Sequence, residues 1–156
     1  MRIYNYSDSV IKMECKHKDG DMTYKESCSL SRKVADAICQ GRYPAILTKT
    51  PFLQKFLANA QVRMLRPSVI VDYRRTAFIY PVSAVRITFD EDIRSGRYST
   101  DIFDKDICTY PVTSKEQSVL EVKCNEFIPA HILAILNSVP KVRLAISKFA
   151  YCREKK

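Results

Sequence analysis

The chain has 156 residues, a length that predicts one domain with its own hydrophobic core. Lys and Arg number 26 against 17 Asp and Glu, and the resulting net charge of +9 favours an anionic partner such as nucleic acid, a membrane surface or a phosphate-rich molecule. No apolar stretch approaches the ~20 residues of a membrane-spanning helix, and no leader sequence is recognised, so we expect a cytoplasmic protein without a transmembrane segment.

Two strands are expected at the start, over 2–6 and 10–18, with turns at 7–9 and 19–21. Side chains alternate between the two faces of a strand, so every second residue of 10–18 shares a face. One face carries Lys12, Glu14, Lys16 and Lys18, and the other carries Ile11, Met13, Cys15 and His17. The sequence therefore predicts a hairpin with one cationic face.

Two helices are expected next. Apolar residues at helical spacing predict the first over 32–40, with Ser31 as its N-cap and Gly41 at its end. The second is expected over 51–64, because proline suits the first helical position, and Pro67 ends it.

The rest of the chain predicts strands over 68–80, 84–90 and 119–124, a helix over 129–136, and a strand passing into a helical tail over 142–152. Charged and apolar residues alternate in 84–90 and 119–124 as they do near the start. The prediction is an antiparallel α+β fold in which helices cover the apolar sheet face and leave a basic face free.

Six cysteines are present, none in a CxxC spacing, so neither disulfides nor a zinc site are expected. Cys15 and Cys124 fall among the apolar positions of their strands and are predicted to be buried thiols. His17 and His131 are not part of any nucleophile pattern and are expected to have structural or surface roles.

Seven short segments, spread in order over nearly the whole chain, form a recognisable set. They are 2–5 (RIYN), 12–16 (KMECK), Lys25, 72–78 (DYRRTAF), 85–90 (VRITFD), 120–123 (LEVK) and 146–149 (ISKF). In this order they resemble the VTC domain, the polyphosphate polymerase branch of the triphosphate tunnel metalloenzyme (CYTH-like) superfamily. The resemblance implies an antiparallel β tunnel, or barrel, with helices packed outside and with Lys, Arg and Glu lining its interior.

The resemblance also implies roles for individual residues. Phosphate binding is implied for Arg2, Lys16, Lys25, Arg75, Arg86, Lys123, Ser147 and Lys148. Catalysis is implied for Lys16, Arg75, Arg86 and Glu121. An Mg²⁺ or Mn²⁺ ion, which prefers oxygen ligands and bridges to phosphates, is implied at Glu121, with Glu14 as a second candidate.

Several of these residues also have a simpler interpretation. Lys25 lies beside a turn and, without the resemblance, would be interpreted as a solvated charge. Lys123 is placed to pair with Glu121. Ser147 is also a candidate helix cap. Only one of the neighbouring residues Arg74 and Arg75 can point into the tunnel, and the family pattern selects Arg75.

The function implied is the transfer of the γ-phosphate of ATP to a growing polyphosphate chain, with ATP and polyphosphate as partners. Two alternatives stay open, a tunnel triphosphatase and a non-catalytic polyphosphate-binding or polyanion-binding fragment. A nucleic-acid partner is not expected, because the aromatic residues form no stacking motif.

The family pattern includes strands ahead of 2–5 that this chain lacks. We therefore expect either a fragment of a longer protein or a reduced relative, with a tunnel that is incomplete at its N-terminal side or completed by another chain. Exposed edge strands favour a homodimer. The tunnel domain is expected over 1–152, followed by a frayed tail at 153–156.

Overall fold

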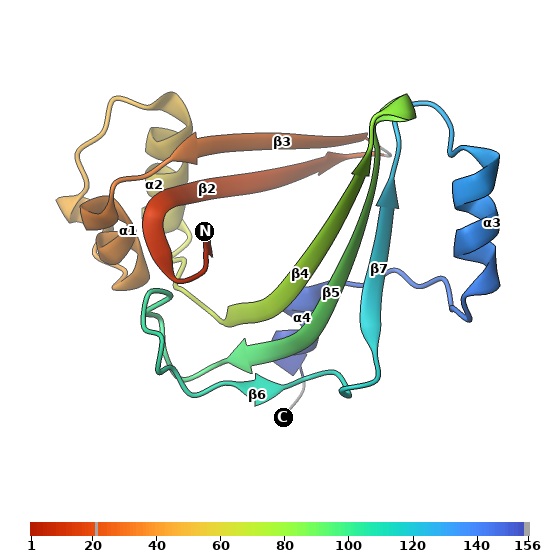
Figure 1. The fold of residues 1–156 in the computed structure, drawn as a ribbon. Helices are drawn as coiled ribbons and strands as arrows, with labels where there is room; N and C mark the ends of the chain where they lie inside the picture. Colours follow the sequence, from red (N-terminus) through yellow and green to blue (C-terminus); the bar gives the residue numbers. More distant parts are fainter. Residues whose placement is uncertain (21, 155–156) are drawn as a thin grey trace. The chain divides into compact units, whose positions relative to one another are not determined.

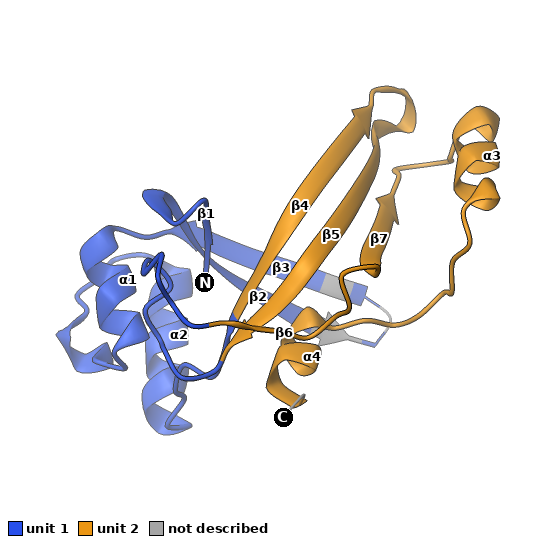
Figure 2. Ribbon diagram, turned by 60° about the horizontal axis from the view of Figure 1, so that its bottom comes forward, with its two compact units in different colours: residues 1–70, 97–108 blue, residues 71–96, 109–156 orange. Residues whose placement is uncertain are grey.

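The computed structural model describes residues 1–20 and 22–154, and for Lys18, Asp19 and Thr23 it describes the backbone alone. The fold is α+β with antiparallel strands, as expected, and the strands form two sheets (Figure 1). The chain separates into two compact units, Met1–Ile70 with Arg97–Cys108 and Val71–Gly96 with Thr109–Lys156 (Figure 2). Each unit is described by itself.

The first unit contains a three-stranded sheet in the order β1 (Arg2–Tyr4), β2 (Ser7–Asp19) and β3 (Met22–Ser29). The first turn lies at Asn5 and Tyr6, two residues earlier than expected, and both have positive φ. Two consecutive positive φ values are typical of the two-residue hairpin loop whose twist matches that of its strands. Of the second predicted turn, Asp21 lies outside the described residues.

Strand β3 was not predicted. In its sequence, MTYKESCS, neither set of alternate residues is entirely apolar. It nevertheless pairs with β2 through eight consecutive residue pairs. The conformation of β3 is therefore decided by backbone hydrogen bonds to β2, whose apolar and charged residues alternate, and not by the side chains of β3 itself.

Helices α1 (Arg32–Cys39) and α2 (Pro51–Val62) contact β2 and β3. Both were predicted, although α2 ends two residues before Met64. Gly41 follows α1 with a φ of +68°, the left-handed conformation expected of a helix-ending glycine. Ser31 occupies the N-cap position but makes no capping hydrogen bond with its side chain.

Two apolar clusters form the core of the first unit. In one, Leu53 and Leu57 of α2 pack with Ile38 of α1. In the other, Ile11 of β2 packs with Ala35 and Phe103. Ile11 thus points to the helices, as the alternation of side chains along the strand predicted. The charged residues at the other alternate positions of β2 lie on the opposite face.

The second unit contains strands β4 (Ile70–Tyr80), β5 (Val85–Gly96), β6 (Tyr110–Pro111) and β7 (Ser118–Lys123). β5 lies at the centre of this sheet, because β4, β6 and β7 all pair with it. The expected strands at 68–80 and 119–124 are present within two residues of their predicted limits. The expected strand at 84–90 is longer than predicted and continues to Gly96.

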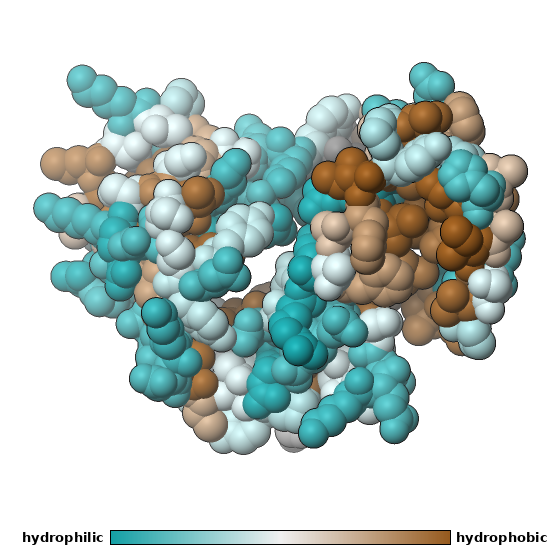
Figure 3. All heavy atoms as spheres, viewed as in Figure 1, coloured by the Kyte–Doolittle hydropathy of each residue, from teal (hydrophilic) through white to brown (hydrophobic). Residues whose placement is uncertain are grey.

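The remaining helices are α3 (Ala130–Ser138) and α4 (Lys148–Glu154). The ring of His131 in α3 packs edge-on against Tyr80 at 5.4 Å, a structural role. Leu133 and Ile135 of α3 are exposed, and apolar side chains gather around this helix in Figure 3. None of the helices in the described residues is long and apolar enough to cross a membrane.

The end of the chain differs from its prediction. Residues 142–147 form no strand, and α4 continues through Arg153 and Glu154. Lys155 and Lys156, the rest of the expected tail, lie outside the described residues.

All six cysteines are free thiols. Cys15 is half-buried, but the prediction for Cys124 is wrong, because it lies one residue beyond the end of β7 and is exposed.

Candidate functional site

The polar face of the first unit is built by strand register. Arg2 pairs with Lys12, and Lys16 lies directly opposite Lys25. Because alternate residues of β2 share a face, these side chains and Glu14 lie on the same side of the sheet, opposite the side that contacts the helices. The side chain of Lys18, expected on this face, lies outside what the structure describes.

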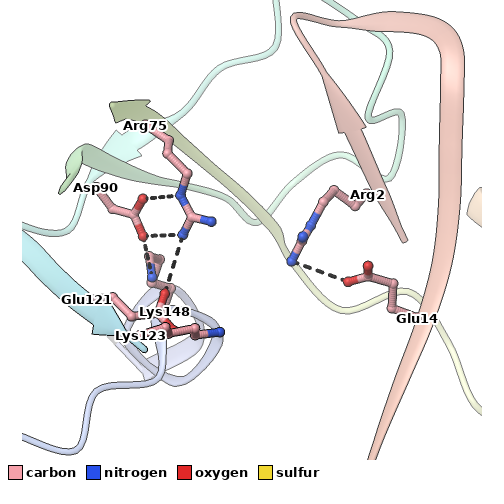
Figure 4. Close-up of polar contacts among 7 residues, drawn as sticks. All are labelled: Arg2, Glu14, Arg75, Asp90, Glu121, Lys123 and Lys148. Atoms are coloured by element: carbon pink, nitrogen blue, oxygen red, sulfur yellow. Dashed lines mark hydrogen bonds and ion pairs between the residues drawn. The ribbon is translucent and has the colours of Figure 1, made fainter. Parts of the chain in front are cut away.

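Glu14 is shared by two cations on this face. Lys25 Nζ lies 2.6 Å from Oε1 and Arg2 Nη2 lies 3.3 Å from Oε2, and Figure 4 shows Arg2 pointing to Glu14. The hydrogen bond from Lys25 and the charge of Arg2 hold the pKa of Glu14 below its ordinary value. Lys25 is therefore ion-paired and is not simply a solvated charge.

The face nevertheless keeps an excess of positive charge. Lys16 and Lys25 are like charges at directly opposed positions, an arrangement that destabilises a sheet, and Glu14 offsets the charge of Lys25 but not that of Lys16. Lys12 and Lys16 are both exposed. The face is therefore suited to a polyanion.

The second unit holds a tighter cluster around Asp90 of β5. The guanidinium of Arg75, on β4, donates Nε–H to Oδ1 at 2.5 Å and Nη2–H to Oδ2 at 2.7 Å. Lys148, the first residue of α4, places Nζ 2.6 Å from Oδ2. Asp90 is 0% exposed, and Figure 4 shows both cations on its carboxylate.

Electrostatics keep this carboxylate charged. Burial by itself raises the pKa of Asp90, but the hydrogen bonds and charges of Arg75 and Lys148 outweigh burial and lower that pKa. The same contact raises the pKa of Arg75 above its ordinary value. Asp90 and Arg75 are therefore both ionised at neutral pH.

Glu121 of β7 lies beside this cluster. Lys123 Nζ is 3.1 Å from Oε1, and Arg75 Nη2 is 3.9 Å from Oε2. Burial raises the pKa of Glu121, but the hydrogen bond from Lys123 and the charges of Lys123, Arg75 and Lys148 lower it overall. Glu121 is an ionised and partly exposed carboxylate among three cations.

Tyr73 adds an aromatic ring to the cluster. Its ring centroid lies 5.3 Å from Arg75 Cζ and 5.4 Å from Lys148 Nζ, within the range of cation–π attraction. Tyr73 and Asp90 both belong to the recognised segments, but sequence reasoning assigned a role to neither. The role of Tyr73 could have been inferred from its spacing, because Tyr73 and Arg75 are two residues apart on one strand and therefore share a face.

The structure therefore brings together four predicted residues in the second unit, Arg75, Glu121, Lys123 and Lys148. Arg86 shares their sheet face, since it pairs with Lys123 in register, and its side chain is exposed. Arg2, Glu14, Lys16 and Lys25 form the face of the first unit.

Two further predictions concern single side chains. Ser147 Oγ accepts a hydrogen bond from the backbone N–H of Ala150 at 3.3 Å, so it caps α4 as the simpler interpretation held. Arg74 is exposed and, by parity, points to the face opposite Arg75.

The donors near Glu121 are suited to a divalent cation. Within the described residues no group of three or more His, Cys, Asp and Glu side chains forms a metal cage. Mg²⁺, however, is usually held by one or two carboxylates together with phosphate oxygens. Thr88 pairs with Glu121 in register, and its buried hydroxyl has no hydrogen-bond partner among the residues described. Glu14 is less suited, because both of its oxygens lie within 3.3 Å of a cation, whereas Oε2 of Glu121 has its cation 3.9 Å away.

Comparison with known proteins agrees with the resemblance carried by the seven segments. A search of curated proteins found no match. The family model of the VTC domain matches residues 1–155, almost the whole chain. The chain therefore belongs to the VTC domain family.

Proposed function

We propose that this chain is a polyphosphate polymerase domain, which binds ATP and polyphosphate and transfers the γ-phosphate of ATP to the end of the growing chain. The observation that carries the proposal is the gathering of Arg75, Lys123 and Lys148 around Glu121, on one sheet face of a VTC-family chain. The family's tunnel architecture is part of the proposal.

Transfer of a phosphoryl group depends mainly on positive charges held at fixed positions around it. The terminal oxygen of polyphosphate attacks the γ-phosphorus, the bond from that phosphorus to the bridging oxygen breaks, and ADP leaves. Negative charge spreads over the oxygens of the transferring group, and fixed cations stabilise it. Arg75 supplies a planar fork that can bridge two oxygens, while Lys123 and Lys148 act as point charges.

Glu121, with phosphate oxygens, would hold the Mg²⁺ or Mn²⁺ ion that the family implies. When bound, such an ion neutralises phosphate charge and orients the triphosphate. Arg86, on the same sheet face, extends the row of cations available to the phosphate chain.

In this proposal the polar face of the first unit also binds phosphate. Arg2, Lys16 and Lys25 bind phosphate there, and the opposed Lys16 and Lys25 share a phosphoryl group between them. Glu14 limits the positive charge of this face and orients Arg2 and Lys25.

The test is to incubate the chain with ATP and Mn²⁺ and to identify the products. Long polyphosphate supports the proposal. Free phosphate alone indicates a triphosphatase, and binding of polyphosphate without any product indicates a non-catalytic polyanion-binding domain.

A variant tests the assignment of Glu121. Glu121→Gln should lower turnover by about 10²- to 10³-fold, the cost of losing one well-placed electrostatic contact, while polyphosphate still binds. Glu91→Gln is the matched control, because Glu91 is exposed on the other face of β5 and loses the same charge. Equal activity of the two variants would show that Glu121 does not act in the reaction.

A further inference from the structure

We infer that Asp90 is a positioning residue, which holds Arg75 and Lys148 in the arrangement that binds phosphate before any ligand arrives. This inference rests on the proposed function, because it concerns the same sheet face. It extends that function to a residue that touches neither solvent nor ligand.

Burial separates the role of Asp90 from that of its neighbours. Its side chain is 0% exposed, and both carboxylate oxygens are occupied by Arg75 and Lys148. A buried carboxylate is costly unless it is paired and hydrogen-bonded. Asp90 therefore acts through the two cations that satisfy it.

Asp90 also helps to attach α4 to β5. Ser95 Oγ donates a hydrogen bond to the carbonyl of Cys152 at 2.6 Å, and Cys152 Sγ contacts the carbonyl of Arg94 at 3.5 Å. Lys148 and Cys152 are four residues apart and lie on one face of the helix. β5 thus holds α4 at two points, through Ser95 and Cys152 and through Asp90 and Lys148. The contact with Asp90 places the ammonium of Lys148 beside Arg75, on the same carboxylate.

Both cations keep donors for a ligand while bound to Asp90. Arg75 has five N–H groups and gives two to Asp90, and Lys148 has three and gives one. Tyr73 contacts the same two cations through its ring. The flexible side chains are therefore ordered in advance, which lowers the entropy cost of binding phosphate.

Charge and position predict opposite effects when Asp90 is neutralised. Asp90→Asn keeps the shape of the side chain but removes a negative charge from an anion site, so electrostatics alone would tighten polyphosphate binding. If Asp90 positions the cations, binding weakens although the site becomes more positive. The direction of the change in affinity therefore separates the two roles.

The experiment measures binding of sodium polyphosphate to wild type, Asp90→Asn and Glu91→Gln by calorimetry. We expect affinity to fall at least about tenfold in Asp90→Asn, as misplaced contacts predict, and to stay level or rise slightly in Glu91→Gln. Equal or tighter binding by Asp90→Asn overturns the inference. Wild type that binds no polyphosphate overturns the proposed function, and the inference with it.

A double variant tests whether Asp90 acts through Lys148. Asp90→Asn combined with Lys148→Gln should lose less affinity than the product of the two single effects, because both changes release the same ammonium. Independent, multiplying effects contradict this route.

A second measurement needs no variant and covers the case in which Asp90→Asn does not fold. In ligand-free wild type, the Nε–H of Arg75 should give a resolved NMR signal that exchanges slowly with solvent, because it is donated to a buried carboxylate. Rapid exchange of that proton without ligand shows that Arg75 is not held in advance, and overturns the inference.

Discussion

At the scale of single residues, the chain uses carboxylates to arrange cations. Glu14 lies between Arg2 and Lys25, and Asp90 lies between Arg75 and Lys148. In each case an acid on a strand holds basic groups to which the proposed function assigns phosphate binding. A search for basic residues alone would overlook these acids, although they fix the positions of the basic side chains.

The lowered pKa of Asp90 predicts a pH dependence of stability. A folded-state pKa below the unfolded value of about 3.9 means that the contribution is complete above that value and is lost as the pH falls through the folded pKa. Thermal melts of wild type and Asp90→Asn should therefore differ by a constant amount above about pH 5 and converge in stronger acid. A difference that persists unchanged down to pH 2 contradicts the assignment.

At the scale of elements, each sheet is organised by one long, well-patterned strand. β2 decides the conformation of β3, and β5 pairs with β4, β6 and β7 and holds α4. Changes in these two strands should have effects beyond their own residues.

Ser95→Ala tests the attachment of α4 to β5. It leaves the carbonyl of Cys152 without its buried donor, a loss of about 1–3 kcal/mol in the free energy of unfolding. Cys152 is 0% exposed, so its labelling by a maleimide, mapped by mass spectrometry, should become faster when α4 loosens. Ser118→Ala, at an exposed position of β7, is the control that should change neither quantity.

Ile11→Ala tests the core of the first unit. Ile11 is 2% exposed and packs against Ala35 and Phe103, so truncation should cost about 2–5 kcal/mol in chemical denaturation. Val10→Ala, on the neighbouring exposed position of the same strand, should cost far less. A larger loss for Val10→Ala than for Ile11→Ala would mean that the faces of β2 are assigned the wrong way round, and equal losses would contradict the assignment.

At the scale of the whole molecule, part of the net charge of +9 lies on two polar sheet faces, one in each compact unit. The proposed function requires both faces to bind phosphate. Self-association along edge strands stays a prediction, which light scattering after size-exclusion chromatography can test.

Hydrogen exchange tests the use of both faces. Polyphosphate at ~100 times its Kd should add about 2.7 kcal/mol to the free energy of unfolding by linkage. Amide protection should increase in β2 and β3 of the first unit and in β4, β5 and α4 of the second. Protection confined to one unit would show that the other face does not take part in binding, and the effect should weaken in high salt.

The sequence by itself determined the family and most of the elements, although not β3 or β6. Alternation along 10–18 and 84–90 predicted which side chains share a face, because a strand's geometry imposes that period locally. Apolar spacing predicted α1 and α2 for the same reason, and seven ordered segments indicated the VTC family, which the family match confirms.

The pair of Lys123 and Glu121 was predicted from their spacing on one strand, but tertiary structure alone decided which distant charges meet. Asp90 is joined to Arg75, 15 residues before it, and to the remote Lys148, and neither contact follows from a local period. The pairing of β3 and the docking of α4 likewise depend on register and packing between distant segments. Periodicity is a property of neighbouring residues, whereas an ion pair depends on where the folded chain brings remote ones together.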